Sequence, residues 1–177
     1  MARPNSLAAL GPIEQLAFVP SDFDAAVKYW TETMGVGPFF LIENIHLDGM
    51  TYRGQPTDAK FAVAIAYWGD VQIELVRAEN DGPAHYNGEY ANHDKLNHVL
   101  VFVDDWAETM RVVAEAGAEV IVSGTFGGNN VVYVDPGSGP GGLVEILQRG
   151  QGGPDLFGMI KAAAKDWDGS EPLRKLG

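Results

Sequence analysis

The chain has 177 residues, with 12 Lys and Arg against 24 Asp and Glu, which gives a formal net charge of −12. An acidic surface repels phosphate backbones and anionic lipids, so the composition argues against nucleic-acid and membrane partners. Cysteine is absent, which excludes disulfides, thiolate zinc sites and a cysteine nucleophile. Any metal ion must therefore be held by nitrogen and oxygen atoms, and a cytoplasmic location is the simplest expectation.

The N-terminal stretch MARPNSLAALGP is too weakly apolar for a signal peptide and is expected to be an irregular leader. After it, the first half of the chain predicts a strand, a helix and three more strands. Ser21 or Asp22 would cap the helix, and Gly35 would end it. The four strands are predicted at 13–19, 39–47, 61–68 and 71–78, and the apolar stripe of the helix is Phe23, Ala26, Val27, Trp30 and Met34.

The same order then repeats after a polar connector at 79–94. A helix with Trp106, Met110 and Val113 on one face is expected to begin after Asp104 and Asp105 and to end near Gly117. The strands of this half are predicted at 96–103, 118–124, 130–135 and 142–148. A linker at 149–154 precedes a helix whose apolar stripe consists of Leu156, Met159, Ile160, Ala163 and Trp167.

The two halves align in register. Gln15 matches His98 at an offset of 83, and Glu74 matches Glu145 at an offset of 71, because the segment 46–60 lengthens the first half. The repeat predicts an α+β fold of two tandem βαβββ modules that form a paired, curved mixed sheet. We expect one domain over residues 1–150, with modules at 11–80 and 95–148, and a C-terminal helix and tail over 151–177.

Each module carries polar residues on strand faces that are otherwise apolar. Side chains alternate along a strand, so Gln15, His98, Glu145 and the pair Gln72 and Glu74 all share faces with buried-type residues. A single histidine in a strand is usually structural, and a single glutamate at a strand end is usually solvated. Buried carboxylates are costly unless paired or bound to a cation. If the modules pack about a pseudo-twofold axis, these equivalent positions converge on one point.

The pattern resembles the vicinal oxygen chelate superfamily, which includes glyoxalase I, methylmalonyl-CoA epimerase, extradiol dioxygenases and bleomycin-resistance proteins. The resemblance covers about residues 11–148, and MGVGPFF together with WDGSEPLR is similar to a glyoxalase-like subgroup near the epimerases. It is carried by IEQLAFVPSDFDAAVKYWTETMGVGPFF, VQIELV, LNHVLVFVDD and GGLVEIL. The resemblance implies a cavity with one divalent metal ion held by residues of the first and last strand of each module: Gln15, Glu74, His98 and Glu145.

Gln72 is an alternative to Glu74, because both lie on the same strand face. One imidazole and oxygen ligands suit Zn, Ni, Co, Mn or Fe. By resemblance, the ion would polarise a carbonyl of a small oxygenated substrate, and Glu145 or Glu74 would move a proton at the adjacent carbon. The implied function is a metal-dependent isomerase or lyase. Candidate substrate contacts are Tyr52, Tyr86 and Tyr133, and the superfamily often forms homodimers.

Two alternatives remain open at this stage. A non-enzymatic binding protein of the bleomycin-resistance type would use the same fold without the metal. An extradiol-type dioxygenase usually needs two histidines and one carboxylate on Fe(II). Because the first-strand position is Gln15, that site would need His46, His85 or His93, and none of these lies at a matching position.

Overall fold

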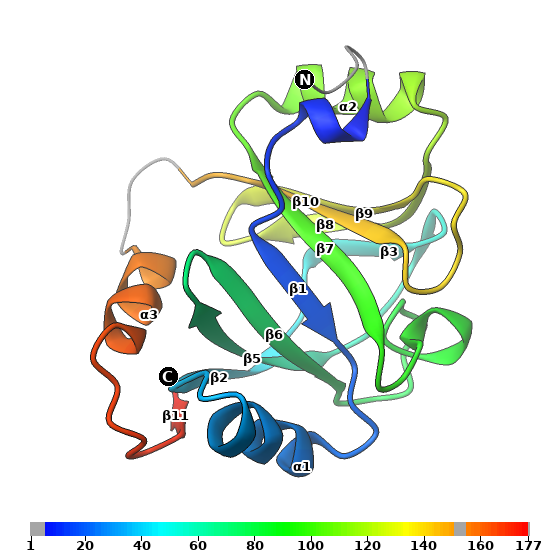
Figure 1. The fold of residues 1–177 in the computed structure, drawn as a ribbon. Coiled ribbons are helices and arrows are strands. Elements are labelled where there is room, and N and C mark those ends of the chain that lie inside the picture. The colour runs from blue at the N-terminus through cyan, green and yellow to red at the C-terminus, as the bar shows by residue number, and fades with distance from the viewer. Residues whose placement is uncertain (1–5, 151–154, 177) are drawn as a thin grey trace.

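The computed structural model describes residues 6–150 and 155–176 (Figure 1). The start of the predicted leader, residues 1–5, and the end of the predicted linker, residues 151–154, lie outside these described residues. The strands are β1 (Gln15–Phe18), β2 (Phe39–Ile45), β3 (Asp48–Tyr52), β4 (Gln55–Pro56), β5 (Phe61–Trp68), β6 (Val71–Ala78), β7 (Leu96–Val103), β8 (Glu119–Phe126), β9 (Asn129–Asp135), β10 (Leu143–Gln148) and β11 (Leu173–Lys175). The α-helices are α1 (Phe23–Lys28), α2 (Trp106–Glu115) and α3 (Leu156–Ala164).

The strands form one curved mixed sheet in the order β11-β2-β5-β6-β1-β7-β10-β9-β8-β3-β4, so the predicted α+β fold is confirmed. The first strands of the two modules, β1 and β7, run antiparallel at the centre (Figure 1). Gln15 lies opposite Leu100, and Ala17 lies opposite His98. The repeat offset of 83 relates Gln15 to His98 and Ala17 to Leu100, so the two pairs are equivalent. The pseudo-twofold axis therefore lies between β1 and β7.

The helices begin where aspartate side chains accept backbone N–H groups. Asp22 accepts from Ala25 N at the start of α1, and Asp105 accepts from Glu108 N at the start of α2. The first helix is shorter than the apolar spacing predicted, because a π-helical turn over Tyr29–Thr33 follows α1. That turn leaves Met34 36% exposed rather than packed.

Hydrophobic packing divides between the two faces of the sheet. On one face, α1 covers small and aliphatic side chains of β5 and β6, and α2 covers valines of β7, β9 and β10. On the other face, a larger cluster includes Val63 and Ile65 of β5, Tyr133 of β9 and Ile160 of α3. The alternation of side chains along β6 sends Ile73 and Leu75 toward α1 and leaves Gln72 and Glu74 on the face of the larger cluster.

A short strand lies at each edge of the sheet, β4 at one edge and β11 at the other. The insertion at 46–60 forms β3 and β4, and β3 pairs with β8 of the other module. The first module therefore covers the free edge of the second. At the opposite edge, β11 pairs with β2. In the described part of the chain, no helix combines the length and apolar character needed to cross a membrane.

Candidate metal centre

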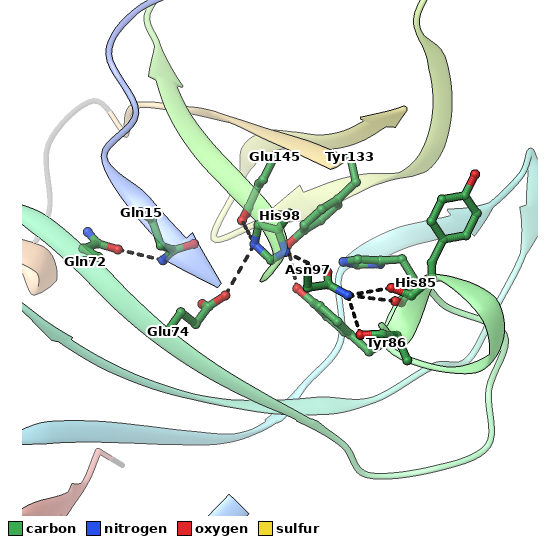
Figure 2. Close-up of polar contacts among 11 residues, drawn as sticks. Gln15, Gln72, Glu74, His85, Tyr86, Asn97, His98, Tyr133 and Glu145 are labelled. Atoms are coloured by element: carbon green, nitrogen blue, oxygen red, sulfur yellow. Dashed lines mark hydrogen bonds and ion pairs between the residues drawn. The ribbon is translucent and has the colours of Figure 1, made fainter. Parts of the chain in front are cut away.

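Three side chains of metal-binding type, from three central strands, meet on the inner face of the sheet. Glu74 of β6, His98 of β7 and Glu145 of β10 are all less than 10% exposed. His98 Nε2 lies 3.5 Å from Glu74 Oε2 and 3.0 Å from Glu145 Oε2 (Figure 2). The three ligand atoms lie within 4.8 Å of one another, so this group could hold a metal ion.

The side chain of Asn97 fixes which nitrogen of His98 faces the carboxylates. The Asn97 amide nitrogen donates to the backbone oxygens of Tyr90 and Ala91, at 2.7 and 3.0 Å. Its oxygen is therefore the atom that faces His98 Nδ1, at 3.0 Å. Because a carbonyl oxygen only accepts, Nδ1 carries a proton, and Nε2 is the ring nitrogen that faces Glu74 and Glu145.

The facing atoms are left without hydrogen bonds. Within the described structure, Glu74 Oε2, His98 Nε2 and Gln15 Oε1 are buried and have no hydrogen-bond partner. Burial and the neighbouring Glu145 carboxylate raise the pKa of Glu74 well above its ordinary value. The two carboxylates repel each other, and a divalent cation would bind both of them together with the facing nitrogen of His98. The residues therefore fit a bound metal ion.

Gln15 completes the group from β1. Its amide nitrogen donates to Gln72 Oε1 at 2.8 Å, and the Gln72 amide nitrogen donates to the Tyr67 hydroxyl at 2.8 Å. These bonds leave the Gln15 oxygen directed toward the side on which His98 lies (Figure 2). Gln72 is thus occupied in holding Gln15, whereas Glu74 is the residue that reaches His98.

The strand pairing supports the same choice between Gln72 and Glu74. Gln15 pairs with Gln72 in the first module, and His98 pairs with Leu143 in the second. The repeat offset of 71 relates Gln72 to Leu143 and Glu74 to Glu145. Glu74 is therefore the residue whose repeat partner is also a carboxylate.

Two of the three predicted substrate contacts reach the cavity beside this group. Tyr86 and Tyr133 line it, and their hydroxyl oxygens lie 3.1 Å apart. Burial, together with the nearby carboxylates of Glu74 and Glu145, raises the pKa of both phenols well above the ordinary value, so both remain hydrogen-bond donors. Tyr52 is not among the lining residues. It lies on β3 and packs against the core at the sheet edge.

Sequence reasoning missed Asn97 and the part played by α3. Asn97 is the unpaired residue between Leu96 and His98 where the β1–β7 register shifts, and its partners are backbone carbonyls of the connector, which no local pattern reveals. Leu156 and Phe157 of α3 line the cavity. In the predicted stripe of this helix, Met159 is instead 42% exposed, and Trp167 lies beyond the end of the helix.

A model of the Glyoxalase/Bleomycin resistance protein/Dioxygenase superfamily matches residues 14–134. The chain belongs to this superfamily. The match extends over β1 and most of both modules, and thus includes Gln15, Glu74 and His98, whereas Glu145 lies beyond its end. A search of curated proteins finds no significant match.

Solved structures with the superfamily fold are similar to this chain at low sequence identity. A hypothetical protein from Bacillus halodurans has a TM-score of 0.56 and 16% identity, with 81% of this chain and 98% of that chain covered. Methylmalonyl-CoA epimerase from Mycobacterium tuberculosis has a TM-score of 0.53 and 14% identity, with 89% and 97% covered. A Streptomyces coelicolor methylmalonyl-CoA epimerase variant in complex with 2-nitronate-propionyl-CoA has a TM-score of 0.51 and 16% identity, with 82% and 99% covered.

Proposed function

We propose that the protein is a metal-dependent isomerase or lyase of the glyoxalase type, with one divalent ion held by Gln15, Glu74, His98 and Glu145. The observation that carries this proposal is the meeting of buried Glu74, His98 and Glu145 with unsatisfied atoms on their facing sides. Core packing alone does not account for two buried carboxylates beside one buried imidazole. Nitrogen and oxygen ligands suit Zn, Ni, Co, Mn or Fe.

A divalent ion bound there would polarise a carbonyl and balance negative charge on two neighbouring oxygens of a small substrate. Glu74 or Glu145 would take the proton from the carbon next to that carbonyl. The C–H bond breaks, the carboxylate becomes a carboxylic acid, and this acid would return the same proton to the substrate at a neighbouring position.

The tyrosine pair would orient the substrate. One hydroxyl of the pair Tyr86 and Tyr133 donates to the other, so the proton of the accepting hydroxyl is free to bond a substrate oxygen. Because both hydroxyls are buried, such a bond is made away from competing water. The homodimer expected from the resemblance stays a prediction, to be checked by the mass of the protein in solution.

A second candidate is a small-molecule binding protein of the bleomycin-resistance type, and the mainly apolar cavity lining favours it. An extradiol dioxygenase has less support. The rings of His46 and His93 bond backbone oxygens of Ala59 and Val19, and the ligand group of the described residues contains one histidine.

Metal analysis of protein purified without added metal tests the proposal. We expect near-stoichiometric first-row metal in the wild type and its loss in His98→Ala. In Glu145→Gln, Co²⁺ titration followed by visible absorption should show weaker binding, because an amide oxygen lacks the carboxylate charge. Glu119→Gln, at an exposed glutamate of β8, is the matched control and should bind like the wild type. Full metal occupancy and full turnover in Glu145→Gln would show the assignment to be wrong.

A further inference from the structure

The cavity beside the proposed metal centre has a buried polar part and a hydrophobic remainder. Its empty space, counted together with its opening to solvent, is about 570 Å³. The polar lining residues are all less than 10% exposed: Gln15, Glu74, Tyr86, Tyr133 and Glu145. The lining side chains that are partly exposed, and so lie nearer the opening, are all hydrophobic: Ile42, Phe126, Leu147, Leu156 and Phe157.

The lining offers no cationic side chain. No Lys, Arg or His is among the described residues that line the cavity. Lys161 of the neighbouring helix α3 instead pairs with Asp70 at 2.7 Å and lies over the ring of Tyr67. The charged groups of the cavity are the two carboxylates, whose charge one divalent ion would balance. A further negative charge on a substrate would therefore face hydrocarbon or carboxylate, which is costly away from water.

We propose that the cavity takes an uncharged, mainly hydrophobic molecule with two neighbouring oxygens at one end, such as an aryl or branched-alkyl α-hydroxyketone. This inference rests on the proposed function, because the oxygen pair would be bound at the metal centre. The carbon skeleton would pack against Phe157, Leu156 and Phe126, which makes these residues the determinants of specificity. A substrate whose body carries carboxylate or phosphate groups is disfavoured by the same walls.

Calorimetric titration of the metal-loaded protein with matched probes tests the substrate class. The neutral probe is 2-hydroxyacetophenone, and the charged probe is its para-carboxylated analogue, which keeps the same oxygen pair and places the charge on the ring. The wild type should bind the neutral probe at least about tenfold more tightly, since burial of an unpaired charge costs more than the roughly 1.4 kcal/mol of a tenfold change. Methylmalonyl-CoA, a larger anion, should also bind more weakly than the neutral probe.

Phe157→Lys should reduce this preference for the neutral probe or invert it, because the new ammonium group pairs with the para-carboxylate. Leu156→Lys places a cation on the neighbouring wall residue and should act in the same direction if the first variant folds poorly. Met159→Lys is the matched control: Met159 lies on the same helix, is 42% exposed and does not line the cavity. Its preference should equal that of the wild type.

Each outcome separates this inference from the proposed function. If the wild type binds the carboxylated probe or methylmalonyl-CoA as tightly as the neutral probe, or binds none of them, the substrate class is wrong even when the metal is present. If the protein binds no metal, the proposed function fails, and the preference between the two ring probes still reports on the cavity walls. A shift in preference in Met159→Lys equal to that in Phe157→Lys would also overturn the role given to the walls.

Discussion

Asn97 and His98 are adjacent in sequence, and the Asn97 side chain orients the His98 ring. Asn97 is completely buried, yet its amide nitrogen is fully used by backbone oxygens of the connector. The connector therefore holds the amide that in turn holds the imidazole. Such outer partners commonly set the orientation and basicity of a metal-binding histidine. The position of His98 Nε2, the proposed ligand atom, thus depends on the packing of a connector that contributes none of the proposed ligands.

His85 is the buried histidine that the proposed chemistry does not use. Its ring is 0% exposed, neither nitrogen has a hydrogen-bond partner within the described residues, and it packs against the rings of Tyr86 and Tyr133. Burial, and to a smaller extent the nearby His98, lowers the pKa of His85 well below its ordinary value of 6.5. The folded protein therefore keeps this imidazole neutral.

This shift predicts an acid-sensitive stability. Below about pH 6.5 the unfolded chain takes up a proton at His85 and the native state does not, so the free energy of unfolding falls as the pH falls, by at most about 1.4 kcal/mol per pH unit for this one group. Replacement of His85 by Phe removes the term while it keeps an aromatic ring. Urea unfolding at pH 7.5 and pH 5.5 should show a smaller loss in His85→Phe than in the wild type. Equal losses would contradict the explanation.

The C-terminal tail packs against the first module through the Trp167 ring and pairs with it through β11. The ring of Trp167 lies against Gly37, where a Cβ atom would come within 2.7 Å of ring carbons. Beyond it, Phe39 N donates to Pro172 O and Leu176 N donates to Leu41 O, so the tail forms the edge strand β11 beside β2. The C-terminal end of α3 is thereby connected to the sheet. The first turn of the same helix supplies Leu156 and Phe157 to the cavity lining.

Gly37→Ala should loosen this attachment. The added methyl group requires the indole to move, and overpacking of this kind costs about 1–3 kcal/mol. Amide hydrogen exchange should become faster at Leu176 and Phe39, whose N–H groups bond across the joint. In a Trp167→Leu background the same substitution should have a much smaller effect, because the clashing ring is gone. An equal effect in both backgrounds would place its cause elsewhere.

The central strands were predictable from sequence, and the edge strands were not. The strands 61–68, 71–78 and 96–103 are confirmed with the same bounds, because long apolar runs between turn residues determine them locally. By contrast, β4 and β11 have two and three residues and exist through pairing with distant strands. The same limit explains Tyr52: its direction depends on the pairing of β3 with β8, which joins residues about 70 positions apart.

The convergence of ligand residues was predictable for a different reason. Gln15, Glu74, His98 and Glu145 occupy repeat-equivalent positions, so the symmetry of the modules supplies long-range information that a single strand lacks. The structure brings Glu74 and Glu145 within ion-pair distance of His98 and leaves the Gln15 oxygen unpaired on the same side. Their role as metal ligands stays a prediction, and so does the proton transfer by Glu74 or Glu145.

The two modules contribute equally to the proposed centre, which gives the metal a structural consequence for the whole protein. Gln15 and Glu74 belong to the first module, and His98 and Glu145 belong to the second. These residues flank the β1–β7 joint, which is the direct strand pairing between the central strands of the modules. A bound ion would cross-link the halves at this joint and remove the repulsion between the two buried carboxylates.

Removal of the ion should therefore destabilise the entire fold. An ion present at 100 times its dissociation constant stabilises the native state by about 2.7 kcal/mol. For a chain of this length, about 2–4 °C in Tm accompanies each kcal/mol, so a chelator should lower the Tm by roughly 5–11 °C. Amide exchange should accelerate most in β1 and β7, whose pairing the ion spans. His98→Ala, which already lacks the ion, should show no response to the chelator. An unchanged Tm in wild-type protein whose metal loss has been verified would mean that the modules are held together by packing and strand pairing alone.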